Sequence, residues 1–271
     1  MTMNAVTTKT LLAQKQSGEK IVSLTAYDAT FARLLDEAGV DVILVGDSLG
    51  MVVQGQPTTL PVTMDDMVYH SRLVARGARR ALIVVDMPFG SIRDQRLALK
   101  NATRLMKEGG AQMVKLEIGE HNIALVRALS DNGIPVCAHL GLLPQSVYKL
   151  GGYRVQGRDE VSAANMMRDA VAIQQAGADL LVLECVPATL ARDISRELKI
   201  PVIGIGAGVD TDGQVLVLYD LLGITPGKRP RFTKDFMRGH DSVQAAVAEY
   251  VAAVRSADFP TADHSFADAA D

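Results

Sequence analysis

The stretch DVILVGDSLGMVVQG, residues 41–55, decides the fold. It begins as an apolar run with the length of a buried parallel strand, then passes into an acid, Asp47, and a turn. An unpaired carboxylate is costly to bury, so an acid at the point where a strand leaves a core is unusual. The pattern recurs where three later apolar runs end in Asp86, Glu117 and Glu184. Because the carboxyl ends of parallel strands share one face, we expect the four acids to converge there.

Composition restricts the class of protein. The 271 residues are 48% hydrophobic, mostly Val, Leu, Ala and Ile, as strands buried on both faces require. A net charge of −3 without a long basic run disfavours nucleic-acid binding. No apolar stretch approaches the roughly 20 residues of a membrane span, and the N-terminus lacks the apolar core of a secretion signal. We interpret Cys137 and Cys185, each inside an apolar run, as small buried hydrophobic residues, and expect a reducing compartment, the cytoplasm.

Strand and helix patterns alternate along the chain. Strands are predicted over 21–26, 41–45, 81–87, 112–117, 134–139, 179–184, 201–206 and 214–219. Helices are predicted over 7–18, 27–38, 64–76, 93–108, 120–132, 160–175, 188–198 and 235–255, and Thr63 with Asp66 resembles a capping box. A glycine-rich stretch over 141–158 is predicted to be irregular.

Eight strands alternating with helices indicate an α/β protein with one domain, a (β/α)8 TIM barrel. We assign residues 1–256, including a short N-terminal helix, to this barrel, and residues 257–271 to a loose tail. The alternative is a doubly wound open sheet. Its dinucleotide-binding form is disfavoured because no G-x-G-x-x-G turn follows the first strand. The glycines at 204, 206 and 208 allow a tight turn, but their spacing is not a nucleotide fingerprint.

Asp47, Asp86 and Glu117 end three successive strands and would be neighbours in a barrel. Converging carboxylates repel one another unless a cation neutralises them. Oxygen ligands alone suit a hard ion, Mg²⁺ above all. Alternatively, each acid pairs with a local Arg or Lys or caps the next helix. We interpret the three together as a Mg²⁺ site.

Two further polar residues lie beside these acids. Lys115 lies two residues before Glu117 and therefore points to the same side of the strand. A lysine inside a buried strand needs an anionic partner, either a substrate carboxylate or Glu117 itself. Ser48 follows Asp47 at a turn, where its hydroxyl and backbone N–H suit a carboxylate or, alternatively, cap the turn.

Two candidates lie on later strands. Glu184 ends an apolar run, where desolvation should raise its pKa, as suits a general base. The alternative is a structural acid held in a salt bridge. His139 ends the preceding strand, where a histidine is a candidate for substrate contact or a structural hydrogen-bonding residue.

Long matching stretches show a family resemblance. From about residue 7 to 266 the chain resembles ketopantoate hydroxymethyltransferases, in TAYDATFA (25–32), VGDSLGMVVQG (45–55), TLPVT (59–63), VVDMPF (84–89), VKLE (114–117), CAHLGLLPQSV (137–147), GGYRVQGR (151–158), LVLECVP (181–187) and PVIGIGAG (201–208). The resemblance implies a barrel that uses Mg²⁺ and transfers a hydroxymethyl group from 5,10-methylenetetrahydrofolate to 3-methyl-2-oxobutanoate through an enolate. The product is 2-dehydropantoate, in pantothenate synthesis. Family members form homodecamers of two pentamers.

The resemblance also implies roles for single residues. The metal group corresponds to Asp47, Asp86 and Glu117. The keto-acid contacts correspond to Asp47, Ser48, Asp86 and Lys115. Glu184 corresponds to the proton acceptor, and His139 to a position near the substrate. The chain departs from the family pattern at Leu143, where we expect Thr, and at Ile118, where we expect Gly.

Two other functions stay open at this point. The first is a related Mg²⁺-dependent barrel enzyme, a 2-keto-acid lyase or phosphonomutase. The chain lacks the Lys-Lys-Cys-Gly-His segment typical of the isocitrate-lyase type, which disfavours this alternative. The second is a catalytically silent barrel, disfavoured because all four strand-end acids are present.

Overall fold

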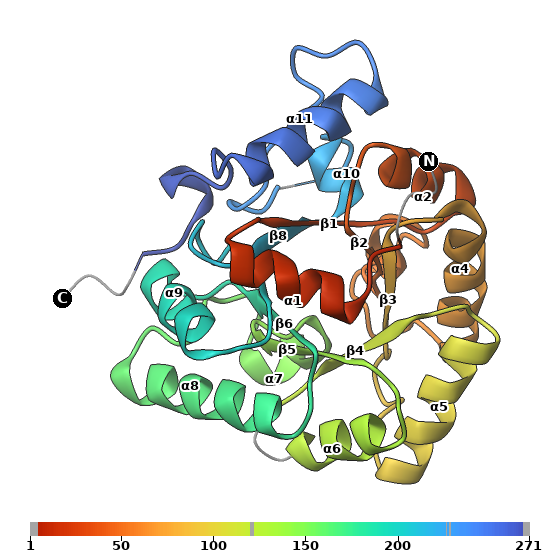
Figure 1. Cartoon of the computed structure of the whole chain (residues 1–271), viewed down its shortest axis with the longest axis vertical. Helices are drawn as coiled ribbons and strands as arrows, with labels where there is room; N and C mark the ends of the chain where they lie inside the picture. The colour runs from red at the N-terminus through yellow and green to blue at the C-terminus, as the bar shows by residue number, and fades with distance from the viewer. Residues whose placement is uncertain (1–4, 120–121, 226, 228, 268–271) are drawn as a thin grey trace.

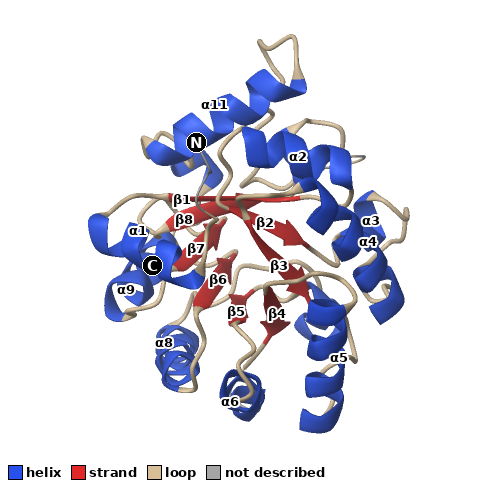
Figure 2. Cartoon of the chain, turned by 45° about the vertical axis from the view of Figure 1, so that its right-hand side comes forward, coloured by secondary structure: helices blue, strands red, loops and turns tan. Residues whose placement is uncertain are grey.

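The computed structural model describes residues 5–119, 122–225, 227 and 229–267. Eight parallel strands close into a barrel in sequence order, and helices surround it (Figures 1 and 2). The strands are β1 Ile21–Thr25, β2 Val42–Val45, β3 Leu82–Asp86, β4 Met113–Glu117, β5 Val136–Gly141, β6 Leu180–Glu184, β7 Val202–Ile205 and β8 Gly213–Leu216. The predicted (β/α)8 barrel is confirmed.

The outer layer consists of the helices between the strands. They are α1 Thr8–Ser17, α2 Ala29–Glu37, α3 Leu49–Val52, α4 Met64–Gly77, α5 Gln95–Lys107, α6 Ile123–Asp131, α7 Val147–Leu150, α8 Glu160–Gln175, α9 Ala188–Glu197, α10 Leu218–Leu221 and α11 Val243–Arg255. The predicted capping box is present, since the Thr63 hydroxyl accepts from the backbone N–H of Asp66 and the Asp66 carboxylate accepts from that of Thr63.

Several predicted boundaries are wrong. The helix predicted over 235–255 begins only at Val243. Asp235 accepts from the N–H of Met237 in a local turn, and Ser242 caps the helix. The last strand ends at Leu216, where α10 follows. The stretch 141–158 is not wholly irregular, because it contains a 3₁₀ turn, Pro144–Ser146, and α7. The predicted start of a helix at residue 120 lies outside the described residues.

Alternate residues of the strands face the interior of the barrel. The interior is filled by apolar side chains that include Val42, Leu82, Val84, Met113, Cys137, Leu180, Val182, Ile203 and Val215. Side chains two residues apart lie on the same face of a strand. These inward rows continue toward the strand ends as Asp86, Lys115, Glu117, His139 and Glu184. The two-residue period therefore directs five polar side chains to one mouth of the barrel.

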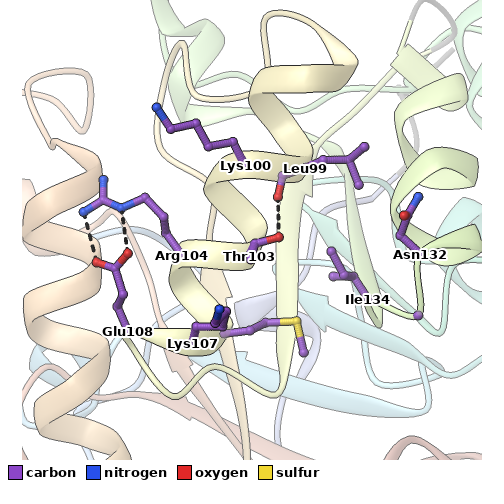
Figure 3. Close-up of a pocket in the computed structure, with 10 residues that line it drawn as sticks. Leu99, Lys100, Thr103, Arg104, Lys107, Glu108, Asn132 and Ile134 are labelled. Carbon is purple, nitrogen blue, oxygen red and sulfur yellow. Dashed lines mark hydrogen bonds and ion pairs between the residues drawn. The ribbon is translucent and has the colours of Figure 1, made fainter.

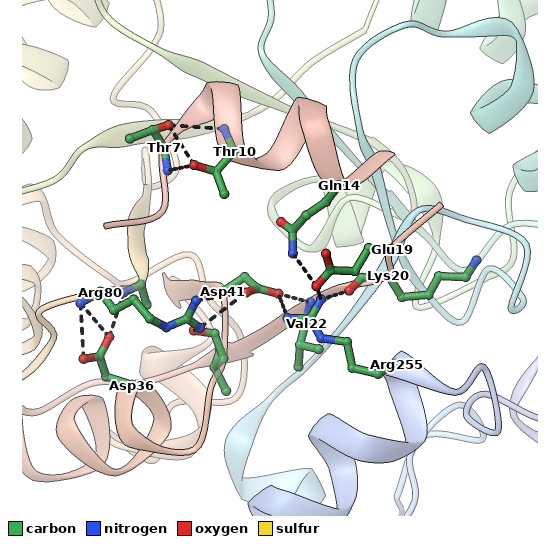
Figure 4. A network of polar contacts seen from close by, with 12 residues as sticks. Thr7, Thr10, Gln14, Glu19, Lys20, Val22, Asp36, Asp41, Arg80 and Arg255 are labelled. Carbon is green, nitrogen blue, oxygen red and sulfur yellow. Dashed lines mark hydrogen bonds and ion pairs between the residues drawn. The ribbon is translucent and has the colours of Figure 1, made fainter. Parts of the chain in front are cut away.

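The opposite end of the barrel is closed by α1 and by a polar network (Figures 1 and 4). Leu11 of α1 packs against the interior apolar residues. The buried Asp36 carboxylate accepts backbone N–H groups from residues 79–81. The Asp41 carboxylate accepts from the Val22 N–H and from Arg255 at 2.7 Å. These contacts join helices to the starts of the strands and so stabilise this end of the barrel.

The segment after α11 packs on the barrel, although we expected it to be loose from residue 257. The Phe259 ring lies 5.4 Å from that of Phe236 and 5.9 Å from that of Tyr250. The N–H of Ala188 donates to the carbonyl of Phe266 at 2.9 Å. Aromatic burial holds this segment, and residues 268–271 lie outside the described residues. In the described part of the chain, none of the helices has the length and apolar character needed to cross a membrane.

Candidate active site

The centre of the site is a buried ion pair between adjacent strands. Strand register places Asp86 beside Lys115, whose Nζ donates to Asp86 Oδ1 at 2.7 Å. The backbone N–H of Asp47 donates to Asp86 Oδ2 at 3.0 Å. Glycine at position 46 leaves room for the Ser48 hydroxyl at this turn, because a Cβ would lie 2.8 Å from that hydroxyl and one of the two would have to shift. These three charged side chains, 4–6% exposed, form one cluster.

The charge of Lys115 is secured by its neighbours. Burial alone would lower its pKa, but the Asp86 and Asp47 carboxylates outweigh burial and raise the pKa above its ordinary value. Lys115 is therefore a cation throughout the physiological pH range. Of the two sequence-based interpretations, the pairing with Glu117 is not what the structure has, since the ion pair is with Asp86.

Glu117 is joined to the cluster by a residue that sequence reasoning missed, Gln145. The Gln145 backbone N–H lies 3.1 Å from both carboxylate oxygens of Glu117. The Gln145 side-chain nitrogen donates to Asp47 Oδ2 at 2.8 Å and to the Met87 carbonyl at 3.0 Å. The signal that could have found it is the family motif CAHLGLLPQSV (137–147), which runs from a strand into the segment that contains Gln145.

The acids disfavour one another's charge. Burial and then the Asp86 charge raise the pKa of Asp47 to about 7, and burial and then the Asp47 charge raise that of Glu117 to about 9. Among the described residues, no three His, Cys, Asp or Glu side chains form a ready metal site, and Gln145 and Lys115 donate to these carboxylates instead. The donor chemistry fits a hard cation, because the set is oxygen only and a cation would relieve the repulsion.

Ser48 presents its hydroxyl beside the same cluster. It occupies the N-cap position of α3 but makes no side-chain capping bond. Its hydroxyl instead lies 2.9 Å from the hydroxyl of Tyr27, a buried residue two positions after β1. Of the two interpretations from sequence, side-chain capping is therefore not observed, and Tyr27 orients the hydroxyl.

Glu184 and His139 form a second polar group in the same mouth. Their side chains approach to 3.3 Å between His139 Nε2 and Glu184 Oε2, without the alignment of a hydrogen bond. Burial raises the pKa of Glu184 to about 7, although the Lys115 charge opposes the rise. A carboxylate with that pKa is suited to accept a proton near neutral pH.

The 141–158 stretch arches over the mouth. Its start is fixed by the Leu142 N–H, which donates to the Glu184 carbonyl at 2.8 Å, and its end by the Gln156 N–H, which donates to the Cys185 carbonyl at 3.0 Å. Between them the Tyr153 hydroxyl lies 3.7 Å from Met51 Sδ. Burial, and then the Glu184 and Asp47 charges, raise the pKa of Tyr153. The exposed Tyr153 therefore lies within electrostatic range of the acids.

A separate groove of about 900 Å³ lies on the outside of the barrel, along α5 and the segment after α6 (Figure 3). Its lining includes three basic side chains of α5, Lys100, Arg104 and Lys107. Arg104 is already paired with Glu108 and Asp65. None of the strand-end polar residues lines this groove, so it is distinct from the candidate active site.

The chain is similar to known proteins over nearly its whole length. A family model described as ketopantoate hydroxymethyltransferase matches residues 5–262. The chain belongs to this family. As a ketopantoate hydroxymethyltransferase family member it is a transferase of pantothenate biosynthesis, and the sequence-based recognition is confirmed.

Named relatives agree over nearly the whole chain. The 3-methyl-2-oxobutanoate hydroxymethyltransferase of Alkalilimnicola ehrlichii is 60% identical over 265 residues, which are 98% of this chain and 96% of the relative. The protein of the same name from Nitrosococcus oceani is 58% identical over 264 residues, which are 97% of this chain and 100% of the relative.

Solved structures share the fold of this ketopantoate hydroxymethyltransferase family member. An oxaloacetate acetylhydrolase in complex with oxalate matches with a TM-score of 0.61 and 14% identity, covering 90% of this chain and 93% of that one. A phosphonopyruvate hydrolase in complex with oxalate and Mg²⁺ matches with a TM-score of 0.59 and 13% identity, covering 78% and 80%. At these identities the likeness shows the barrel alone.

Proposed function

We propose that this enzyme transfers a hydroxymethyl group from 5,10-methylenetetrahydrofolate to C3 of 3-methyl-2-oxobutanoate, giving 2-dehydropantoate. The observation that carries the proposal is the arrangement at the barrel mouth. A buried Asp86–Lys115 pair with two further acids lies there together with Glu184, a carboxyl group whose raised pKa suits a base. Family membership supports the choice of a keto-acid acceptor.

We assign Asp47, Asp86 and Glu117 to the Mg²⁺ site. Their mutual repulsion and oxygen-only donors support this assignment. When bound, Mg²⁺ would supply Lewis acidity at the keto oxygen and make the C3 proton easier to remove. The phosphonopyruvate hydrolase of the same fold was solved with oxalate and Mg²⁺, and oxalate, like a 2-keto acid, carries oxygen donors on adjacent carbons.

Lys115 and Ser48 are suited to bind the keto acid. Lys115 keeps its positive charge in a buried position, where attraction to a substrate carboxylate is little screened. The Ser48 hydroxyl, oriented by Tyr27, is a donor for the same carboxylate. Asp47, Asp86 and His139 complete the proposed keto-acid contacts.

Glu184 is the proposed proton acceptor. It takes the C3 proton, the electron pair of that C–H bond forms the C2–C3 double bond, and the carbonyl π pair moves to the keto oxygen to give the enolate. The enolate carbon then attacks the methylene carbon of the folate as one of the two C–N bonds of that carbon breaks, and the released nitrogen takes up the proton. Water then replaces the second nitrogen on the same carbon and gives that nitrogen a proton, which releases tetrahydrofolate and leaves the hydroxymethyl group on C3. The base is separate from the Asp86–Lys115 pair, so it is free to accept a proton.

The 141–158 stretch is proposed to cover the site during the reaction. Both of its ends are bonded to the backbone of β6 or the residue after it, and Tyr153 lies near the acids. Excluding water from the mouth would protect the enolate from being reprotonated. Unchanged turnover after residues 148–154 are replaced by a short glycine linker would contradict a covering role.

We further propose that the enzyme is a cytoplasmic homodecamer, with residues 1–256 as its catalytic domain and 257–271 as a C-terminal tail. The resemblance to the family supports the assembly. The two buried free cysteines, Cys137 and Cys185, suit a reducing compartment. Light scattering of the purified protein should give ten times the mass of one chain, and a smaller species would contradict the decamer.

Deuterium exchange at C3 of 3-methyl-2-oxobutanoate tests the proposed function, with Mg²⁺ present and folate absent. We expect exchange that requires Mg²⁺ and that is abolished by Glu184→Gln. Exchange that survives in the variant would assign the proton to another group, with His139 next in line. Product formation should in addition require methylenetetrahydrofolate, which a keto-acid lyase or phosphonomutase would not need.

A further inference from the structure

Among the described residues, Gln145 is the one uncharged side chain that donates two hydrogen bonds beside the acid cluster. Its Nε2 donates to Asp47 Oδ2 at 2.8 Å and to the Met87 carbonyl at 3.0 Å, while its backbone N–H contacts both oxygens of Glu117 at 3.1 Å. One residue thereby joins the positions that follow β2 and β3 to the end of β4.

The orientation of the Gln145 amide follows from its partners. A carboxylate oxygen and a backbone carbonyl accept hydrogen bonds and donate none. Both therefore require the NH₂ group, and a flipped amide would face two acceptors with its own oxygen. The assignment of Nε2 toward Asp47 and Met87 is thus chemically determined.

The backbone holds Gln145 in place from both sides. Leu142 is buried and its N–H bonds the Glu184 carbonyl. Val147 is buried at the start of α7, and Pro144 begins the 3₁₀ turn, where its fixed φ suits a first helical position. The side chain therefore reaches the acids from a segment that is anchored on either side.

An uncharged donor is the suitable link at this point. Lys115 already supplies the cation that Asp86 requires. A second cation would compete with Mg²⁺ for the same oxygens, whereas an amide orients a carboxylate and leaves its charge available. Each bonded oxygen also keeps a second lone pair for a further ligand.

We propose that Gln145 is a positioning residue that fixes Asp47 and Glu117 relative to one another, so that both can bind the divalent cation and the keto acid. This inference rests on the proposed function. It assigns no contact with the reacting atoms to Gln145, which acts through the two acids.

The test measures Mn²⁺ binding by electron paramagnetic resonance, in wild type and in three variants. Gln145→Met keeps the volume of the side chain but removes both donors, and Gln145→Glu places an acceptor and a charge against Asp47. The matched control is Gln156→Met in the same stretch, because the hydrogen bond of the Gln156 side chain among the described residues goes to the Arg154 carbonyl and not to the acids. Thermal unfolding checks that each variant is folded.

We expect Gln145→Met to raise the Mn²⁺ Kd roughly tenfold or more, as loss of an orienting partner typically does. Gln145→Glu should have a Mn²⁺ Kd that differs from that of Gln145→Met. It should also lose more affinity for the keto acid than Gln145→Met does, because the introduced carboxylate repels the carboxylate of the substrate. Gln156→Met should stay within twofold of wild type. When Mn²⁺ and 3-methyl-2-oxobutanoate are both saturating, the C3 exchange rate of Gln145→Met should recover to within a few fold of wild type.

A wild-type Mn²⁺ Kd in Gln145→Met would overturn the inference and leave the proposed function intact, since side-chain volume alone would then suffice. An exchange rate that stays low when Mn²⁺ and 3-methyl-2-oxobutanoate are both saturating would also overturn it, because the defect would then act through neither cation binding nor keto-acid binding. If wild type itself neither bound Mn²⁺ nor exchanged C3 deuterium, the proposed function would fail and this inference with it.

Discussion

His139 Nε2 lies 3.3 Å from Glu184 Oε2 in the interior of the barrel, on neighbouring strands. His139 is 2% exposed, and neither of its ring nitrogens has a hydrogen-bond partner among the described residues. Burial, reinforced by the Lys115 charge, lowers the pKa of His139 well below its ordinary value. The ring is therefore neutral, and its contact with Glu184 joins an uncharged polar group to a carboxyl group rather than forming an ion pair.

The first prediction concerns the pH dependence of proton removal. Burial raises the pKa of Glu184 to about 7, and only its ionised form accepts a proton. The C3 exchange rate should therefore fall as the pH drops, with a midpoint at or below about 7 because a bound cation favours the ionised form, and above the ordinary value near 4.5. Glu184→Gln should lower the rate by roughly 10²–10⁴-fold. Glu197→Gln, at an exposed position, is the control, and a midpoint near 4.5 would contradict the prediction.

The second prediction concerns His139. Replacing the neutral imidazole by an apolar ring, His139→Phe, removes the polar edge that faces Glu184 and leaves its ionised form less well solvated. The midpoint of the exchange profile should then move to higher pH, and His139→Asn should move it less. The profile of exchange rate against pH measures both shifts. An unchanged midpoint in His139→Phe would show that the imidazole does not influence the base.

The third prediction concerns the buried Asp86–Lys115 pair. Lys115→Met leaves a buried carboxylate without its cation and should lower the free energy of unfolding by about 3–5 kcal/mol. The double variant Asp86→Asn with Lys115→Met removes both charges and should recover part of that loss. Urea unfolding measures the free energy of unfolding of wild type, of both single variants and of the double variant. Additive losses in the double variant would mean that the two side chains do not stabilise one another.

The fourth prediction concerns Gly141, the last residue of β5, which lies beside the proposed base Glu184. A Cβ there would lie 2.2 Å from the Glu184 carbonyl oxygen, and φ is +95°. Gly141→Ala should therefore displace Glu184 and lower the C3 exchange rate as well as the stability. Gly133→Ala is the matched control, because φ is +74° with open space around it. It should cost about 1–2 kcal/mol of unfolding free energy through backbone strain and leave exchange unchanged. Equal C3 exchange rates in Gly141→Ala and Gly133→Ala would contradict the predicted clash with Glu184.

The fifth prediction compares the two buried cysteines. Cys185 has a φ of +48°, directly after the proposed base, whereas Cys137 lies within β5. Glycine relieves the left-handed strain at position 185, about 1–2 kcal/mol, but weakens a regular strand at position 137. Cys185→Gly should therefore be less destabilising than Cys137→Gly in urea unfolding. The opposite order would show that packing of the Cys185 thiol outweighs the strain.

Much of the site could be predicted because it depends on a local pattern. An apolar run that ends in an acid identifies both a strand and the side chain at its carboxyl end, and the two-residue period then orients Glu117 and Lys115 alike. Asp86, Glu184 and His139 follow from the same rule. Boundaries such as Val243 were missed because a local turn at Asp235 and a Ser242 cap override the amphipathic pattern.

The sequence by itself determined the barrel, the family and the strand-end residues that the site contains, since each follows from periodicity or from matching stretches. Only the tertiary structure decided which of these groups touch. Lys115 pairs with Asp86 rather than Glu117 because strand register sets them side by side. Gln145 reaches Asp47 across 98 residues of sequence because the stretch after β5 folds back over the mouth. Contacts of that kind depend on register and loop path, which no local pattern encodes.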